Sequence, residues 1–217
     1  MEDSLKKYWK VRLKEVKKTL EENNFDVYIA DDGAAVNDIV LKEIIPQLKP
    51  QSVSWGGSIT LTDIGLYDKL KGSRELKVLD TFDKKLSDAD KLELRRQALL
   101  TDLFITGTNA LTDTGKLVNL DMIGNRVAAL TFGPKNVIIL VGRNKIIADV
   151  DEAILRIKNL AAPANVARLG MKTPCLKTGY CEECQSKFRI CNNWTITEKS
   201  YPKGRIKVVL INENLGL

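Results

Sequence analysis

Histidine is absent from this chain of 217 residues. That absence excludes histidine-dependent catalytic triads, histidine general bases and histidine metal ligands. Any catalysis must therefore use carboxylates, lysine, cysteine, amides or a bound cofactor. Long apolar runs are missing too: no segment reaches the length that a membrane span needs, and the opening stretch MEDSLKKYWK has no apolar signal core. We therefore expect a cytoplasmic protein.

The sequence also lacks the motifs of the common nucleotide cofactors. GxGxxG does not occur, and no flavin motif is found. The formal net charge is +6, but much of the positive excess falls on one predicted helix, without the aromatic or groove-entering elements of a nucleic-acid binder. NAD, flavin and nucleic acid are therefore not expected among its ligands.

The apolar content is high enough for one sizeable core. Hydrophobic residues make up 44% of the chain, which predicts a single domain over residues 1–217. Within residues 1–24, apolar side chains recur at helical spacing and predict an amphipathic helix: Leu5, Trp9, Leu13, Val16 and Leu20. Lysines fill its other faces. They form either a solvated face or a docking surface for an acidic partner.

Apolar runs typical of strands alternate with helical patterns along the rest of the chain. Strands are predicted at residues 26–30, 52–55, 76–80, 103–106, 137–141 and 206–212. Helices are predicted at about 36–48, 60–70, 87–100 and 149–161, the last two with Ser87 and Asp149 as N-caps. This alternation predicts an α/β fold with a mainly parallel sheet covered by helices on both faces. Ligands of such sheets bind beyond the carboxyl ends of the strands.

Two segments follow strands at that rim. The first is residues 56–60, where Gly56, Gly57 and Ser58 come before a helix and Thr60 lies in its first turn. Paired glycines let a ligand approach the main chain, and a capped helix N-terminus favours an anion. The turn is therefore either an anion-binding turn or only a tight turn with a good cap.

The second segment, residues 106–125, is rich in small polar side chains. Asp113-Thr114-Gly115 is typical of a hairpin turn, which would return residues 117–120 beside the strand. Local turn preferences explain such residues in part. They explain the amides of Asn109, Asn119 and Asn125 less well, because these lie among apolar residues and buried amides need partners. We expect a ligand to supply those partners.

Lys145 follows the most apolar of the predicted strands, in the sequence Gly142-Arg143-Asn144-Lys145. A lysine at a strand end can reach into a cleft toward an anion. The other interpretation is an ordinary surface lysine.

All four cysteines fall in one irregular-looking segment, residues 162–201. Their spacing is Cys175-x5-Cys181-x2-Cys184-x6-Cys191. A CxxC unit offers two thiolates in one turn, which suits an iron–sulfur cluster or zinc. The spacing matches neither a regular zinc ribbon nor the common ferredoxin run. An iron–sulfur cluster, zinc, and reduced or disulfide-forming thiols all stay open from the spacing alone.

Several motifs, in order along most of the chain, resemble the LUD (lactate-utilisation domain) family. They are WGGSITL (55–61), TGTNALTDTGKLVN (106–119), GNRVAA (124–129), FGPKNVIILVGRNK (132–145), AAPANVAR (161–168) and TPCLKTGYCEECQSKFRIC (173–191). The family is similar to the superfamily of ribose-phosphate isomerases, glucosamine-phosphate deaminases and CoA transferases, which implies a Rossmann-like fold.

The resemblance also implies a site. Its positions here are Gly107, Thr108 and Asn109, the turn at residues 113–115, and Lys145. Asn109 stands where several relatives have an aspartate, and an amide is a poor proton acceptor at neutral pH. Asn109 is therefore expected to bind a substrate oxygen, and Asp113 and Asp121 remain the candidates for acid–base work.

The resemblance favours one function over two others. It implies that the chain is an oxidoreductase component of a multi-subunit system that oxidises L-lactate to pyruvate. In that system the chain would carry an iron–sulfur cluster and transfer electrons. The alternative is a stand-alone enzyme or sensor that binds a sugar phosphate, CoA ester or carboxylate, with a structural zinc site. A third is an assembly subunit that docks a partner through the first helix. The chain is expected to associate either with other subunits of such a system or with further copies of itself.

Overall fold

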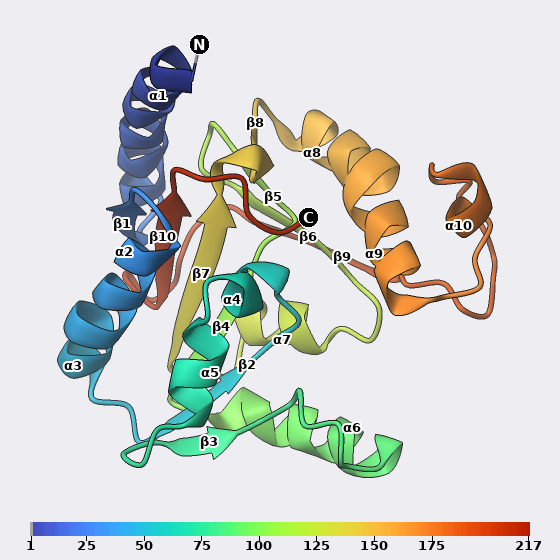
Figure 1. The fold of residues 1–217 in the computed structure, drawn as a ribbon, viewed down its shortest axis with the longest axis horizontal. Coiled ribbons are helices and arrows are strands. Elements are labelled where there is room, and N and C mark those ends of the chain that lie inside the picture. The colour runs from blue at the N-terminus through green and yellow to red at the C-terminus, as the bar shows by residue number, and fades with distance from the viewer. Residues whose placement is uncertain (1) are drawn as a thin grey trace.

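A computed structural model describes the protein from residue 2 to residue 217, with side chains from Ser4 onward. Its centre is a six-stranded sheet whose strands all run parallel (Figure 1). In spatial order these are β1 (Asp26–Ala30), β10 (Ile206–Ile211), β7 (Asn136–Gly142), β4 (Leu103–Gly107), β2 (Ser52–Trp55) and β3 (Lys77–Leu79). The predicted α/β fold with a mainly parallel sheet is confirmed.

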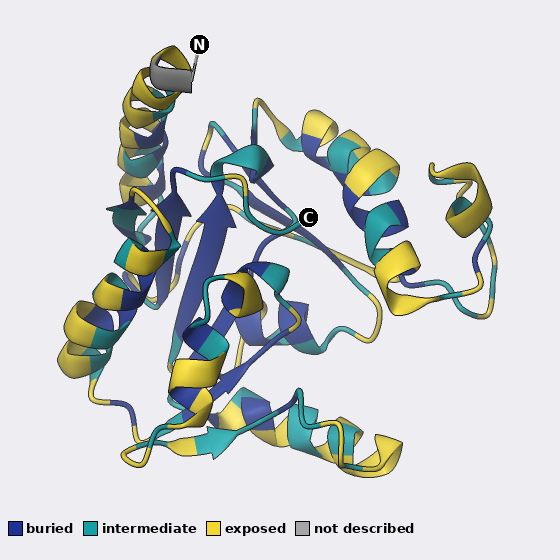
Figure 2. Ribbon diagram, viewed as in Figure 1, coloured by how far each residue is buried: buried dark blue, intermediate teal, exposed yellow. Residues whose placement is uncertain are grey.

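Helices cover both faces of this sheet, so its central strands are buried (Figure 2). Successive side chains of a strand point to opposite faces. Phe104 therefore packs with one set of helices, and Leu103 and Ile105 pack with the other. The first set is α1 (Glu2–Glu22), η2 (Ala98–Leu100) and α7 (Asn125–Thr131). The second set is α2 (Gly33–Asp38), η1 (Ile39–Ile44), α3 (Ile45–Leu48), α4 (Ile59–Asp63) and α5 (Leu66–Lys71).

The chain changes face between two neighbouring strands, β2 and β4. The connection from β2 to β3 runs through α4 and α5 on one face, and the connection from β4 to β7 runs through α7 on the other. In an open parallel sheet such a reversal leaves a crevice at the carboxyl ends of the two strands, where ligands bind. Both polar segments singled out in the sequence begin there.

A second, smaller sheet stands beside the first, with strand order β8 (Ile146–Ile147), β5 (Ala110–Thr112), β6 (Leu117–Asp121) and β9 (Asn193–Thr197). β5 and β6 form the predicted hairpin, and Gly115 takes φ +76 in its turn. The hairpin does not return beside β4 as expected, because β2 and β7 already pair with both edges of that strand. It pairs with β8 and β9 instead.

A nearly continuous helix covers this small sheet: α8 (Val150–Arg156), η4 (Ile157–Ala161) and α9 (Ala162–Leu169). The segment 162–201 is therefore not irregular throughout, since it contains α9, α10 (Cys175–Thr178) and β9. Ala162 and Val166 extend the buried stripe of α8, which explains why the helix continues. Between α9 and β9, α10 and its loops project from the body (Figure 1).

The local signals for helix starts and strands agree with the structure. Ser87 caps α6 (Asp88–Gln97) and Asp149 caps α8, each by accepting a hydrogen bond from the backbone three residues on. The helix expected at 60–70 is divided into α4 and α5 at Gly65, which takes φ +70. Within the part of the chain that the structure describes, no helix is both long and apolar enough to cross a membrane.

Candidate functional site

The glycine-rich turn after β2 lies directly against the end of β4. A side-chain carbon on Gly56 would come within 3.0 Å of the Arg126 side chain. One on Gly107 would come within 3.0 Å of Ser58 Oγ. Ser58 also caps α4 through its hydroxyl. The structure therefore brings these two polar segments together, with no space between them for bulkier residues.

Arg126 on α7 fills the space behind that turn and is buried. Its guanidinium donates hydrogen bonds to Asn119 Oδ1 at 2.5 Å and to Asn109 Oδ1 at 2.8 Å. It also donates to the carbonyl oxygens of Gly107 at 3.2 Å and Leu120 at 2.8 Å. The amide oxygens that the sequence left for a ligand are thus bound by a protein cation.

One hydrogen-bond donor among the Asn109 and Asn119 side chains has no partner among the described residues. Thr108 Oγ1 donates to Asn119 Oδ1 at 3.1 Å, and the backbone N–H of Asn109 donates to the same oxygen at 3.3 Å. Asn119 Nδ2 is buried and has no hydrogen-bond partner within residues 2–217. Buried donors without a partner are rare. This amide therefore marks a place where a ligand oxygen or a water molecule fits.

Lys145 lies where the two sheets meet, at the end of the turn η3 (Arg143–Lys145) between β7 and β8. Only 4% of it is exposed, so it is not the surface lysine that was the other interpretation. Its Nζ donates to Thr60 Oγ1 at 3.3 Å. Among the described side chains, no carboxylate forms a salt bridge with it.

A third cation, Arg156 on α8, completes the cluster. Its Nη1 donates to the carbonyl oxygen of Asn109 at 2.7 Å, and its Nε donates to that of Asn144 at 3.2 Å. These bonds fix the guanidinium between the hairpin and the Lys145 turn. Its Nη2 makes no hydrogen bond to any described residue, so it remains available to a ligand.

The two arginines disfavour the charged form of the lysine. Burial, followed by the charges of Arg156 and Arg126, lowers the pKa of Lys145 to about 7, and Asp63 opposes the shift only in part. Burial also lowers the pKa of Arg126, although Asp121 lies 3.6 Å from its Nε. Three cations thus share the site with two nearby carboxylates. The arrangement favours an anion that would supply the missing negative charge.

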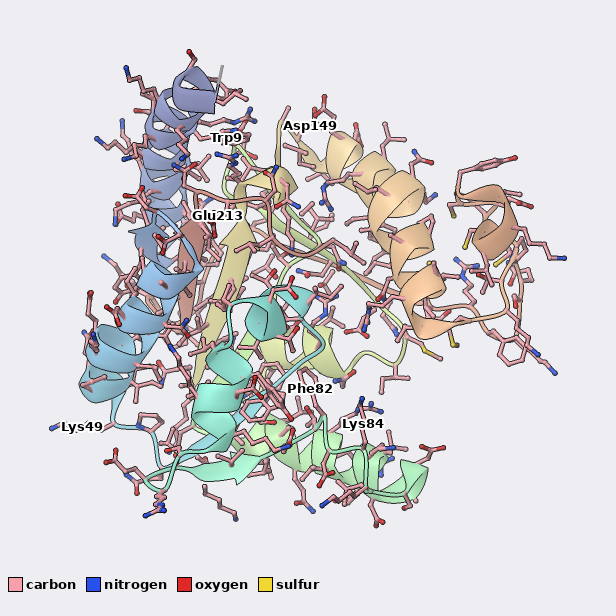
Figure 3. The ribbon with its side chains drawn as sticks, in the orientation of Figure 1. Trp9, Lys49, Phe82, Lys84, Asp149 and Glu213 are labelled. Carbon is pink, nitrogen blue, oxygen red and sulfur yellow. The ribbon has the colours of Figure 1, made fainter. Side chains whose placement is uncertain are left out.

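The segment 212–217, which we call the strap, runs from β10 across this cluster; Figure 1 shows its end over the strand ends. Leu215 N donates to Asn144 Oδ1 at 3.0 Å, and Asn144 Nδ2 donates to the Gly216 carbonyl oxygen at 3.2 Å. Glu213, labelled in Figure 3, accepts a hydrogen bond from Gly33 N at 3.1 Å. The strap is therefore tied at both of its ends.

The strap also touches the lysine. A side-chain carbon on Gly216 would lie 2.6 Å from Thr60 Oγ1 and 3.0 Å from Lys145 Nζ. Gly216 has φ +66, in the left-handed region that favours glycine. Backbone atoms of the strap therefore occupy space beside the lysine that a bound ligand would need.

The two candidate acids have partners elsewhere. Asp113 lies in the hairpin turn, where it accepts three hydrogen bonds from the Arg12 guanidinium of α1, the shortest at 2.7 Å. Asp121 accepts from Val127 N at 3.3 Å in the first turn of α7. Asn125 begins that helix. Asp113 and Asp121 thus have structural partners, and Asn125 is the first residue of a helix, whereas Lys145 is a buried cation without a carboxylate partner among the described side chains.

The four cysteines surround one cavity. Cys175, Cys181, Cys184 and Cys191 line it together with Arg189, and its free space is about 20 Å³. Arg189 holds the loop by donating to the carbonyl oxygens of Cys191 at 2.8 Å and Cys184 at 2.9 Å. Burial and the charges of the other three sulfurs raise the pKa of Cys191 to about 11, with Arg189 opposing.

The donor chemistry of this cavity fits a metal. Thiolates are the preferred ligands of iron–sulfur clusters and of structural zinc. All four thiols are free. Within the described residues, however, no three histidine, cysteine or acidic side chains are arranged as a ready metal-binding group. The sulfurs share one cavity without converging on one point.

Sequence reasoning missed the two arginines and the strap. Arg126 lies inside the GNRVAA motif, and Arg156 interrupts the apolar helix 149–161, but arginine is usually a surface residue and neither stood out. One signal was present, since the amides of Asn109 and Asn119 required a buried donor. The strap had no signal in the sequence at all.

Comparisons with known proteins agree with this architecture. A family model described as the LUD domain matches residues 13–211. The chain is also similar to the crystal structure of a DUF162 family protein from Deinococcus radiodurans, with a TM-score of 0.53 and 16% sequence identity. That likeness covers 93% of this chain and 96% of the other, and it shows a shared fold. No curated protein matches the sequence.

Proposed function

Because this chain belongs to the LUD domain family, we propose that it is a lactate-utilisation protein that binds a small carboxylate at Lys145, as a component of a system oxidising L-lactate to pyruvate. The observation that carries the proposal is the buried, unpaired Lys145 between Arg126 and Arg156. A buried cation without an anion is costly unless a ligand supplies the charge. Lactate and pyruvate each carry one carboxylate of suitable size.

The arrangement supports the following role for each side chain under this proposal. Arg156 offers its free Nη2 to one carboxylate oxygen, and Lys145 offers its ammonium to the other. Arg126 has its donors committed to amides and carbonyls, so it contributes charge and rigidity. The buried Thr60 hydroxyl, which is bonded to Lys145, is placed to meet a ligand hydroxyl. The strap and Thr60 pack closely on the lysine, which favours a ligand of few atoms over a CoA ester.

Carboxylate binding should weaken as the pH rises from 6 to 8. The pKa of Lys145 is about 7, so the ammonium that attracts the anion is lost across this range. Calorimetric titration with L-lactate, and with inorganic phosphate as a second anion, measures the effect. Tighter binding at the higher pH, or no binding of either anion at any pH, would contradict the proposal.

The cysteine cavity supports the oxidoreductase half of the proposal. Cys175, Cys181, Cys184 and Cys191 would hold an iron–sulfur cluster, and Arg189 beside them would balance part of its negative charge. Such a cluster, when bound, supplies one-electron transfer. Because the four sulfurs do not converge on one point, the loop between α9 and β9 would have to rearrange around a cluster.

A stand-alone anion-binding protein with structural zinc is the second candidate. The same cavity volume favours it, because a space of about 20 Å³ suits a single ion, around which the four sulfurs would have to converge. In that case the cysteines would serve only to fold the projecting loop. The anion site at Lys145 is common to both candidates.

Anaerobically purified protein should therefore contain iron and acid-labile sulfide in equal amounts, about four of each per chain for a cubane cluster, and absorb visible light. Cys184→Ser should remove the colour. Surface substitution Arg168→Leu, in the exposed part of α9, serves as the control that keeps it. Colourless protein with about one zinc per chain would support the second candidate, and protein with neither metal would reject both metal assignments.

A further inference from the structure

Lys145 differs from the other buried lysine of the chain, Lys207. Lys207 lies 3.5 Å from a carboxylate oxygen of Asp26 and donates to Asn136 Oδ1 at 3.1 Å. Among the residues that the structure describes, Lys145 forms one hydrogen bond, to the Thr60 hydroxyl. Two arginines near it further disfavour the ammonium form. In its neutral form the Lys145 amine therefore has a free lone pair and few hydrogen-bond partners that compete for it.

We propose that Lys145 is a nucleophile that captures the ketone of a 2-oxo carboxylate as an imine. The inference rests on the proposed function, since it needs a carboxylate bound at the same cationic cluster. It goes further by giving the lysine a covalent role and by naming the ligand class: a carbonyl carbon directly attached to a carboxylate, as in pyruvate.

The reaction requires no cofactor. The neutral Nζ attacks the carbonyl carbon, forming a C–N bond while the C=O π pair moves to oxygen, which takes up a proton. The carbinolamine then loses that oxygen as water and leaves the C=N double bond. One amine and one ketone give one imine and one water, with no change of oxidation state, so the capture is reversible by hydrolysis.

The surrounding residues suit this chemistry. Arg156 Nη2 can hold the carboxylate, which fixes the adjacent carbonyl toward the lysine. Thr60 Oγ1, 3.3 Å from Nζ, can exchange a proton with the carbinolamine oxygen. Desolvation beside other cations is an established way to activate a lysine for imine formation. Asp63 is the carboxylate whose charge opposes this activation, and Lys145 does not form a salt bridge with it.

The pH dependence of capture is opposite to that of anion binding. With a lysine pKa of about 7, the neutral fraction rises roughly tenfold between pH 6 and pH 8. Pyruvate capture should rise over the same range in which L-lactate binding falls. A merely electrostatic lysine would give the same falling profile for both ligands.

The strap limits access to the amine, and the test must allow for this. Gly216→Ala places a side chain 2.6 Å from Thr60 Oγ1 at a positive φ, so the strap must shift away. This variant provides a protein in which access is not the limiting step.

The experiment treats the full chain and the Gly216→Ala, Lys145→Arg and Lys207→Arg variants with pyruvate and cyanoborohydride, then maps adducts by peptide mass spectrometry. We expect a reduced pyruvate adduct on Lys145 at a yield about tenfold above that on Lys207, rising from pH 6 to pH 8. The Lys145→Arg variant should lose this adduct, and Lys207→Arg should keep it.

Calorimetry on the same samples distinguishes a failure of imine capture from a failure of anion binding. If L-lactate binds but Lys145 is labelled no more than Lys207, in both the wild-type protein and Gly216→Ala, imine capture is overturned and anion binding stands. If neither L-lactate nor pyruvate binds and no adduct forms, the proposed function fails and the inference fails with it.

Discussion

Replacing Arg126 by leucine is expected to lower the free energy of unfolding by about 3–5 kcal/mol, because it breaks a buried charge network. The guanidinium donates to two amide oxygens and two carbonyl oxygens, and three of these four acceptors belong to buried residues. Leucine fills most of the volume and leaves all four acceptors with fewer donors, each at a cost in desolvation. It also leaves Asp121 without its nearest cation.

Thermal unfolding provides the measurement. For a chain of this length, about 3–5 kcal/mol corresponds to a melting temperature lower by roughly 6–20 °C. Arg168→Leu is the matched control, because Arg168 is exposed and its side chain bonds, among the described residues, only to Asn165 within its own helix. That variant should stay within about 0.5 kcal/mol of the wild-type protein. An Arg126→Leu protein as stable as the control would show that the network contributes little.

Lys145→Met is expected to act in opposite directions on binding and on stability. Removing the ammonium from a buried anion site should weaken L-lactate binding by about 2–4 kcal/mol, which is roughly 30- to 1000-fold in Kd. The same change should raise the free energy of unfolding at pH 7 by about 1–3 kcal/mol, because a desolvated amine among cations gives way to an apolar side chain of similar length.

The pH dependence of that stability gain has a definite sign. The folded pKa of Lys145 is lowered from 10.5 to about 7, so the unfolded chain binds more protons between these two values. Wild-type stability should therefore rise with pH across this window, and the advantage of Lys145→Met should be largest below pH 7 and shrink above it. Chemical denaturation at pH 6.5 and pH 9.5 measures the difference.

Lys207→Met is the control for this pair of effects. It removes a second buried lysine, at the opposite end of the sheet, that already has Asp26 and Asn136 as partners. It should leave L-lactate binding unchanged. It should not stabilise the fold, because the Asp26 carboxylate loses its cationic partner. A Lys145→Met protein that still binds L-lactate with wild-type affinity would remove Lys145 from the site.

The parallel sheet could be predicted because its evidence is local. A run such as VIILV in β7 is apolar at every position, which indicates a strand buried on both faces. Ser87 and Asp149 are N-cap residues, and each predicts the start of its helix from the few residues that follow it. The small sheet could not be predicted in the same way. β8 is two residues long, and β9 is mostly exposed and pairs with β6 from far along the chain.

The site divides along similar lines. Lys145 and the residues near Gly56 and Gly107 could be located, because each follows a strand whose end falls on the same rim. Arg126 and Arg156 could not, since their burial depends on helices packing from two different layers. The cysteine spacing left an iron–sulfur cluster, zinc and reduced or disulfide-forming thiols open. The four thiols line one cavity, and the spacing carries no information on the size of that cavity.

The strap competes with a ligand for the space beside Lys145. Leu215 and Gly216 lie against Thr60 and Lys145, so a ligand that needs the space of their backbone atoms can bind only to molecules in which this segment has moved. The observed dissociation constant is then the intrinsic one divided by the open fraction, and each factor of ten in that fraction corresponds to about 1.4 kcal/mol. A partner that grips residues 212–217 would therefore raise the affinity for the ligand without touching it, and ligand binding would in turn expose that segment to the partner.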